Sequence, residues 1–193
     1  MSSELSRILV AQQGIGVVTN WLLETERLRL RPVDADDAPN LLQLNSDPEV
    51  MKYLGDEAST LEAMLEILPK IIARNKIHDD RLGLFMAHLK STDEFIGWFL
   101  LRPDPLEQTA NLEIGYRLKK VHWGKGFATE GSRSLMDYAL KTFAPKRIFA
   151  TAMEKNSASV AVMQKIGLKF EKLFVEPGYE HTGEKDVLYS MTY

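Results

Sequence analysis

The chain has 193 residues, 45% of them hydrophobic and 26% charged, and its 24 Lys and Arg against 27 Asp and Glu give a net charge of −3 at pH 7. This length is typical of one domain, and the hydrophobic content excludes a disordered chain. Cysteine is absent, which excludes a disulfide scaffold, a thiolate metal site and a cysteine nucleophile. The slightly acidic balance argues against nucleic acid as a partner, and no apolar run reaches the roughly 18 residues of a membrane helix.

Residues 1–21 are predicted to form an N-terminal extension, and residues 22–193 a single domain. The extension is mildly apolar, but Gln12, Gln13 and Gly14 interrupt it, and it lacks the basic start of a signal peptide. We therefore expect a cytoplasmic protein with no membrane partner.

The first part of the domain is predicted to contain one strand followed by helices. Residues 25–33 alternate leucine with arginine, which is the period of a half-buried strand. Asp34, Asp36 and Asp37 then offer carboxylates that can cap a helix, and a short helical piece follows at 48–53. Residues 61–72 repeat apolar side chains at helical spacing behind a capping-box pattern that starts at Ser59.

The second part is predicted to contain six strands, at 82–89, 95–101, 112–118, 147–153, 170–175 and 186–191. A helix opens at Gly126, and a short helix over 156–165 ends at Gly167. A turn at Pro177 and Gly178, followed by an acidic loop, is expected to join the last two strands. There are no repeats and no linker, so the chain is predicted to be one α/β domain.

The segment between the strand at 112–118 and the helix after Gly126 is the most informative part of the chain. Gly124 and Gly126 precede a helix N-terminus, whose free amides and dipole attract anions. Four basic residues crowd into nine positions here: Arg117, Lys119, Lys120 and Lys125. These features indicate a phosphate site, most readily for a pyrophosphate. The alternative is that the glycines only permit a tight turn.

Two known phosphate loops do not match this segment. The Walker A pattern requires Lys and Ser or Thr after its second glycine, whereas Phe127 follows Gly126. The dinucleotide fingerprint requires a third glycine where Thr129 stands, and it follows the first strand of a domain.

The run from Trp123 to Glu130 resembles the cofactor loop of the GNAT superfamily of acyl-CoA-dependent N-acetyltransferases. Within the superfamily it is similar to the branch that contains the ribosomal-protein-alanine N-acetyltransferases. Residues 156–167, with Asn156 and Ser159 followed by Lys165 and Gly167, agree with the same branch, and so does the opening of the domain at 23–31. The resemblance extends over about residues 22–191.

The resemblance implies a mixed, mostly antiparallel twisted sheet with flanking helices, in which the fourth and fifth strands splay apart around acetyl-CoA as co-substrate. The pantetheine arm is expected at the backbone of Tyr116, Arg117 and Leu118, and at Asn156. Lys165 is expected to reach the nucleotide end. The pyrophosphate is expected on the loop residues Gly124, Lys125, Gly126, Phe127, Ala128 and Thr129.

The chain departs from the family pattern at three positions. Val121 stands where the superfamily prefers Gln or Arg, and Ala161 where many relatives carry arginine. Met163 stands where a tyrosine often serves as the general acid. Backbone amides still suffice for cofactor binding, but the general acid has to be sought elsewhere.

Acetyl transfer to an amine requires a base, because an alkylammonium has a pKa near 10. Glu113 is the candidate base, since it points at the cleft if Leu112 and Ile114 face the core; a solvated strand carboxylate is the alternative. Ser159 is the candidate acid for the leaving thiolate, the alternative being a bond to its own helix backbone. The four histidines show no ligand spacing, so no metal is predicted.

The expected activity is transfer of acetyl to a primary amine, with a protein N-terminus as the favoured acceptor. A polyamine, an amino acid or an aminoglycoside is the alternative, and so is a CoA-binding protein without turnover. Acidic loops could form a negative mouth for a cationic amine, at Asp34, Asp36, Asp37, Glu176, Glu180, Glu184 and Asp186. The protein is expected to be a monomer or a homodimer.

Overall fold

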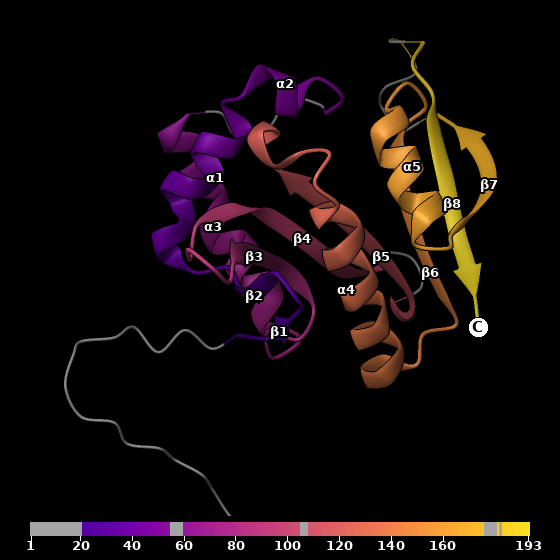
Figure 1. Ribbon diagram of the computed structural model, residues 1–193, viewed down its shortest axis with the longest axis horizontal. Coiled ribbons are helices and arrows are strands. Elements are labelled where there is room, and N and C mark those ends of the chain that lie inside the picture. Colours follow the sequence, from indigo (N-terminus) through magenta and orange to yellow (C-terminus); the bar gives the residue numbers. More distant parts are fainter. Residues whose placement is uncertain (1–20, 55–59, 105–107, 176–180, 182) are drawn as a thin grey trace, which may run out of the picture.

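The computed structural model describes residues 21–54, 60–104, 108–175, 181 and 183–193. Within them the strands form one eight-stranded sheet in the order β1-β2-β3-β4-β5-β6-β8-β7, seen in Figure 1. Every neighbouring pair is antiparallel except β5 and β6, which run parallel. The strands are β1 (Leu23–Glu24), β2 (Leu28–Pro32), β3 (Gly83–Leu89), β4 (Phe95–Asp104), β5 (Gln108–Leu118), β6 (Arg147–Met153), β7 (Lys169–Phe174) and β8 (Asp186–Thr192).

Helices cover both faces of this sheet. A core that includes Leu41, Met64 and Met86 packs α1 (Ala38–Asn45), α2 (Pro48–Met51) and α3 (Leu61–Lys76) on one face. A second core that includes Phe99 and Leu135 packs α4 (Phe127–Phe143) on the other face, and Met163 joins α5 (Ser157–Lys165) to it. Figure 1 shows the two groups of helices on either side of β4 and β5. The predicted α/β domain is therefore confirmed, with an additional short strand, β1, at its start.

The structure refines the expected helix starts. Asp34 caps a short 3-10 helix, η1 (Ala35–Asp37), in a capping box with Asp37. The N-cap of α3 is Thr60, whose hydroxyl accepts a hydrogen bond from the N–H of Ala63. Within the described residues, the helix therefore has a single side-chain cap at Thr60 in place of the capping box predicted from Ser59 to Glu62, because Ala63 has no side-chain acceptor. The expectations for residues 1–20 and for the turn at Pro177 and Gly178 lie outside the described residues.

The parallel pair β5 and β6 separates after three residues. Its partners are Asn111 with Arg147, Leu112 with Ile148, and Glu113 with Phe149. Beyond this point β5 continues to Leu118 and β6 to Met153, but the two strands no longer pair with each other. One edge of β5 from residue 114 to residue 118 is thus not used by the sheet, which is the expected splay.

Two glycines allow the close packing around this edge. Gly97 of β4 has a φ of 143°, and a Cβ there would lie 2.1 Å from the carbonyl oxygen of Arg117 on β5. A Cβ on Gly131 of α4 would lie 2.2 Å from the ring of Phe99. Only glycine therefore lets β4 approach the end of β5 and lets α4 press onto the sheet.

Candidate active site

The glycine loop leaves the first amides of α4 without a side-chain cap. Gly124 and Gly126 have left-handed backbone, with φ of 72° and 84°. Gly126 is the N-cap of α4, and no described side chain accepts a hydrogen bond from the first turn. The N–H groups of Phe127, Ala128 and Thr129 can therefore bind an anion, which the helix dipole favours further.

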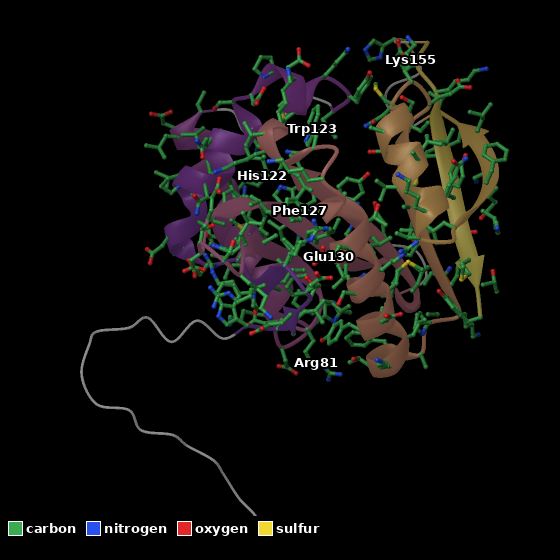
Figure 2. All side chains as sticks on the ribbon, viewed as in Figure 1. Arg81, His122, Trp123, Phe127, Glu130 and Lys155 are labelled. Atoms are coloured by element: carbon green, nitrogen blue, oxygen red, sulfur yellow. The ribbon has the colours of Figure 1, made fainter. Side chains whose placement is uncertain are left out.

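A hydrogen-bonded cluster of Thr25, Arg27 and Glu130 fastens this loop to the start of the domain. Glu130 Oε1 accepts from Thr25 Oγ1 at 2.5 Å and from the Arg27 N–H at 2.9 Å, while Oε2 accepts from Arg27 Nε at 2.6 Å. Arg27 Nη1 donates to the carbonyl of Lys125 at 3.0 Å, and its guanidinium lies 4.4 Å from the centre of the Phe127 ring. Figure 2 shows Phe127 and Glu130 in succession along the start of α4. One arginine thus holds both the loop and the first turn of the helix.

Glu130→Gln is expected to lower the free energy of unfolding by about 1 kcal/mol at pH 7, because it removes a charged acceptor from the cluster. Burial alone would raise the pKa of Glu130, but the hydrogen bonds from Thr25 and Arg27 outweigh it and lower the pKa below 4.5. The stabilisation is therefore present above pH 4.5 and is lost as the pH falls through the lower pKa of the folded state.

Urea unfolding of the wild type and of Glu130→Gln between pH 3 and pH 7 measures this difference. The two curves should converge toward acid pH. Glu154→Gln, on an exposed loop, is the matched control and should follow the wild type at each pH. A constant gap between wild type and Glu130→Gln would contradict the role of the charge.

A cavity of about 610 Å³ opens beside the loop. It brings together the predicted residues Gly126, Thr129 and Lys165 and adds two cations, Arg27 and Arg133. Arg133 Nη2 donates to the carbonyl of Lys165 at 2.6 Å and so joins α4 to the end of α5. Three carboxylates, Glu26, Glu130 and Asp137, line the same cavity, and Glu130 is paired with Arg27. Arg133 and Lys165, next to the uncapped amides of α4, are the groups that fit the phosphates of a nucleotide cofactor.

The basic cluster seen in the sequence does not gather at this cavity, and this part of the prediction is wrong. Arg117 is buried and donates through Nη1 to a side-chain oxygen of α1 at 2.6 Å. Lys119 lies over an aromatic ring of β4, and Lys120 forms an ion pair with a carboxylate of α2. Arg117 lies on β5, Lys119 follows the end of that strand, and Lys120 begins a short 3-10 helix, so the run passes through three different local structures and does not form one patch. Lys125 alone of the four lies in the glycine loop.

Tyr116, Ser159 and Asn156 meet across the splay. The Tyr116 hydroxyl, on β5, donates to Ser159 Oγ, on α5, at 3.2 Å. Asn156 is the N-cap of α5, and its Oδ1 accepts from the Ser159 N–H at 3.1 Å. Burial raises the pKa of Tyr116, although the bond to Ser159 opposes this, so the phenol remains protonated at neutral pH. Met163 is buried in the core and supplies no hydroxyl.

The backbone of β5 over Tyr116, Arg117 and Leu118, where the pantetheine arm was expected, borders the splay. One edge of this segment pairs with β4, and the other pairs with none of the described strands. The Leu118 carbonyl accepts a hydrogen bond of 2.7 Å from Trp123 Nε1, which ties the loop to the end of β5. Apart from the Leu118 carbonyl, the edge of β5 that faces β6 pairs with no described strand beyond residue 113, so a linear amide chain can hydrogen-bond there.

Glu113 lies at the last residue pair before the splay. Leu112 and Ile114 are buried in the core, so Glu113 points to the opposite face, as the alternation predicted. There its Oε2 accepts a hydrogen bond of 2.6 Å from Arg102 Nε on β4. Its position fits the predicted cleft, and its role as a base stays a prediction.

Two of the three aspartates expected in a negative mouth after β2, Asp34 and Asp37, are engaged by Arg31 instead. Asp37 is 1% exposed, and both its oxygens accept from the Arg31 guanidinium at 2.7 Å. Asp34 caps η1 and also pairs with Arg31. The carboxylates of Asp34 and Asp37 thus stabilise the turn after β2, whereas the Asp36 side chain is exposed.

The structure describes two of the other acidic residues of the expected mouth, Glu184 and Asp186. Glu184 pairs with Lys155 at 2.7 Å. Burial, and then the nearby charge of Glu184, raise the pKa of Asp186. Glu176 and Glu180 lie outside the described residues. Among the described residues no cluster of His, Asp and Glu is arranged to hold a metal ion, and no helix has the length and apolarity to cross a membrane.

Comparison with known proteins agrees with this geometry. Residues 27–169 match the model of the acetyltransferase (GNAT) domain. The chain belongs to the GNAT family of acetyltransferases. Its fold is that of the family, and acetyl-CoA is its co-substrate, as the uncapped α4 N-terminus and the splay already indicate.

Two sequence relatives and one solved structure illustrate the relationship. An uncharacterized N-acetyltransferase, p20, from Bacillus licheniformis is 32% identical over 78% of this chain and 84% of its own length. The FsC-acetyl coenzyme A-N(2)-transacetylase of Aspergillus fumigatus is 30% identical over 88% of this chain and 75% of its own. RimL, a ribosomal L7/L12 alpha-N-protein acetyltransferase solved with coenzyme A, superposes with a TM-score of 0.72 at 17% identity, over 87% of this chain and 95% of that one. At this identity the last comparison shows the fold alone.

Sequence reasoning missed the partners of several site residues. The cluster of Thr25, Arg27 and Glu130 joins two of the segments that carried the family resemblance, but they stand 103 residues apart. The bond between Tyr116 and Ser159 spans 43 residues. A local spacing pattern carries no signal for either contact.

Proposed function

We propose that this acetyl-CoA-dependent N-acetyltransferase acetylates the primary amine of a small molecule, with Glu113 and Ser159 moving the protons. The observation that supports the proposal is that β5 has elements suited to the cofactor on one face and a cavity for an acceptor on the other. The uncapped amides of α4 and the splay lie toward one face, and a cavity of about 440 Å³ lies on the other.

The amides of Phe127, Ala128 and Thr129 bind the pyrophosphate, which the glycines at 124 and 126 admit. Lys125, Arg133 and Lys165 neutralise phosphate charge from the loop and from the adjoining cavity. The free edge of β5 from Tyr116 to Leu118 pairs with the pantetheine amides, and Asn156 borders the same gap. This arrangement belongs to the single domain of residues 22–193.

Bound acetyl-CoA supplies an acetyl group on a thioester, and the protein manages two protons. Glu113 accepts a proton from the amine nitrogen, because only a neutral nitrogen can attack a carbonyl. The nitrogen–carbon bond forms as the carbon–sulfur bond breaks. The new amide nitrogen loses its second proton to solvent. Ser159 Oγ donates its proton to the leaving sulfur and receives the Tyr116 hydroxyl proton in turn, which solvent then restores. Since the Tyr116 hydroxyl donates to Ser159 Oγ, the serine hydrogen is free for this step.

The size of the cavity on the α1 and α3 face favours a small amine over the protein N-terminus that the sequence resemblance favoured. About 440 Å³ falls within the usual range of small-molecule pockets, roughly 300–1,000 Å³. Asp34 and Asp37 are engaged by Arg31, and Glu184 by Lys155, which reduces the negative charge that would suit a cationic acceptor. Cytoplasmic location and a monomeric or dimeric state remain predictions.

Calorimetry with CoA and an assay of thiol release over a panel of amines test the proposal. The panel contains an alanine-terminated peptide, amino acids, simple alkylamines, spermidine and an aminoglycoside. We expect CoA binding, and thiol release with small amines. Efficient turnover of the peptide alone would favour the protein acceptor. CoA binding without thiol release on any amine would favour a binding protein without turnover.

Glu113→Gln is expected to lower kcat/KM about 100-fold at pH 7, the usual contribution of a general base. The loss should shrink as the pH approaches the amine pKa near 10, because the amine then deprotonates without help. Rates of variant and wild type from pH 6.5 to pH 9.5 measure this, with unchanged CoA affinity as the control. A ratio that stays constant with pH would argue against Glu113 as the base.

A further inference from the structure

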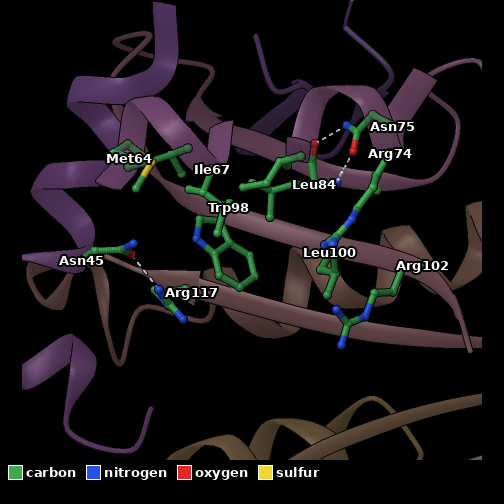
Figure 3. Close-up of a pocket in the computed structure, with 13 residues that line it drawn as sticks. Asn45, Met64, Ile67, Arg74, Asn75, Leu84, Trp98, Leu100, Arg102 and Arg117 are labelled. Carbon is green, nitrogen blue, oxygen red and sulfur yellow. Dashed lines mark hydrogen bonds between the residues drawn. The ribbon is translucent and has the colours of Figure 1, made fainter. Parts of the chain in front are cut away.

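The cavity opposite α4 has features that select one class of acceptor. It lies between α1 and α3 on one side and strands β3, β4 and β5 on the other (Figure 3). Its volume is about 440 Å³. It is lined by Leu41, Asn45, Met64, Ile67, Ile71, Arg74, Asn75, Gly83, Leu84, Trp98, Leu100, Arg102 and Arg117.

The floor of the cavity follows the part of β5 at which the splay begins. Arg102, Leu100 and Trp98 of β4 pair with residues 113, 115 and 117 of β5. Residue 113 is the last to pair with β6, so the floor extends from there along the free segment of β5. Residue 115 is a glycine, where an added Cβ would make only ordinary contacts with Leu100, at 3.6 Å. A bound amine therefore approaches β5 where a side chain is missing.

Positive charge dominates the polar part of the lining. Arg102 is paired with Glu113, and Arg117 donates to Asn45 while its guanidinium lies 4.9 Å from the centre of the Trp98 ring. Arg74 reaches down from α3 over Leu100, as Figure 3 shows, and forms no hydrogen bond or ion pair with the described residues. The rest of the lining is mainly apolar. An anionic group next to an apolar body would find complementary partners here.

We infer that this cavity binds the acceptor as an amine that carries a carboxylate on an apolar body, an apolar amino acid being the simplest example. The inference rests on the proposed function and adds the class of acceptor. The carboxylate lies among Arg74, Arg102 and Arg117, and the apolar body packs on Trp98 and Leu100. The amine of the acceptor faces the side chain of Glu113, which forms an ion pair with Arg102.

The same charges disfavour two of the acceptors considered from the sequence. A polyamine or an aminoglycoside brings several further positive charges close to three arginines, and like charges in a partly desolvated site repel each other strongly. A decarboxylated amine loses the arginine contacts and keeps only the apolar ones. Charged hydrogen bonds of this kind contribute enough to separate matched substrates by tenfold or more.

Matched substrates and matched variants test the inference. L-phenylalanine and 2-phenylethylamine differ only in the carboxylate, and spermidine represents the polyamines. We expect kcat/KM for phenylalanine to exceed that for phenylethylamine at least tenfold, and spermidine to be the poorest. Arg74→Gln should lower the value for phenylalanine about tenfold and change that for phenylethylamine less than twofold. Lys70→Gln removes an exposed cation of the same helix outside the cavity and should change neither.

A binding measurement separates this inference from the proposed function. N-acetyl-L-phenylalanine, the product, is titrated by calorimetry into the wild type, Arg74→Gln and Lys70→Gln. If the product binds the wild type and Lys70→Gln equally, and Arg74→Gln more weakly, the result supports the site. If no amine is turned over while this binding pattern holds, the proposed function fails and the inferred site stands. Absence of binding, or a preference for phenylethylamine or spermidine in the assay, would overturn the inference.

Discussion

Gly126→Leu is expected to weaken CoA binding at least tenfold, measured by calorimetry. Gly126 has a φ of 84° at the N-cap of α4, and no described side chain caps the helix there. An added Cβ would lie 3.4 Å from Arg27 Nη2. A leucine there would crowd the loop beside the first amides of α4 and hinder the approach of an anion. Loss of one charge-assisted hydrogen bond costs roughly 1.5–3 kcal/mol, which corresponds to about tenfold or more in affinity.

Gly183→Leu is the matched control for this experiment. Gly183 also has left-handed backbone, with a φ of 68°, and no atom lies within 4 Å of an added Cβ. Both variants carry the same kind of backbone strain, roughly 1–2 kcal/mol, and should lose comparable thermal stability. CoA affinity should fall in Gly126→Leu alone. Equal affinity in wild type and Gly126→Leu would contradict the placement of the pyrophosphate.

Ser159→Ala is expected to lower kcat about 100-fold while CoA affinity changes little, because a positioned general acid contributes at least about this much. Ser159 Oγ accepts from the Tyr116 hydroxyl, which leaves its own hydrogen to donate. Tyr116→Phe removes that orienting bond and should lower kcat by a smaller factor. Thiol release under saturating acetyl-CoA and amine measures both effects.

Ser157→Ala provides the control on the same helix. Ser157 is the first residue of α5 and is exposed, two positions before Ser159. Its replacement should leave kcat within about twofold of the wild type, as expected for a surface substitution. If Ser159→Ala retained wild-type kcat, the serine hydroxyl would serve only as a hydrogen-bonding group within α5, and the thiolate would receive its proton from another group.

The sequence predicted the fold well because its signals are local. Alternation of leucine and arginine over residues 25–33 corresponds to β2, and apolar side chains at helical spacing correspond to α3 and α4. Gly126 marks the start of α4, since a left-handed residue ahead of a helix favours glycine. The burial of Leu112 and Ile114 on one side of β5 also followed from the two-residue period.

The charged residues were less predictable. Asp37 was expected to cap a helix or to join a negative mouth, yet it is buried beneath the Arg31 guanidinium. Arg117 reads as part of a phosphate patch, yet it turns to the face of α1. A charge can pair with any opposite charge or polar group that the fold brings near, and spacing along the chain does not limit that choice.

The sequence by itself determined the family, the order of the elements apart from the short strand β1, and the loop on which the cofactor is expected. Each of these depends on patterns among residues close together in the chain. Only the tertiary structure decided that Arg27 and Glu130 secure that loop, that Tyr116 reaches Ser159 across the splay, and that arginines line the cavity on the far face of β5. These contacts join segments far apart in the chain. They depend on the packing of helices on both faces of one sheet, which no local pattern specifies.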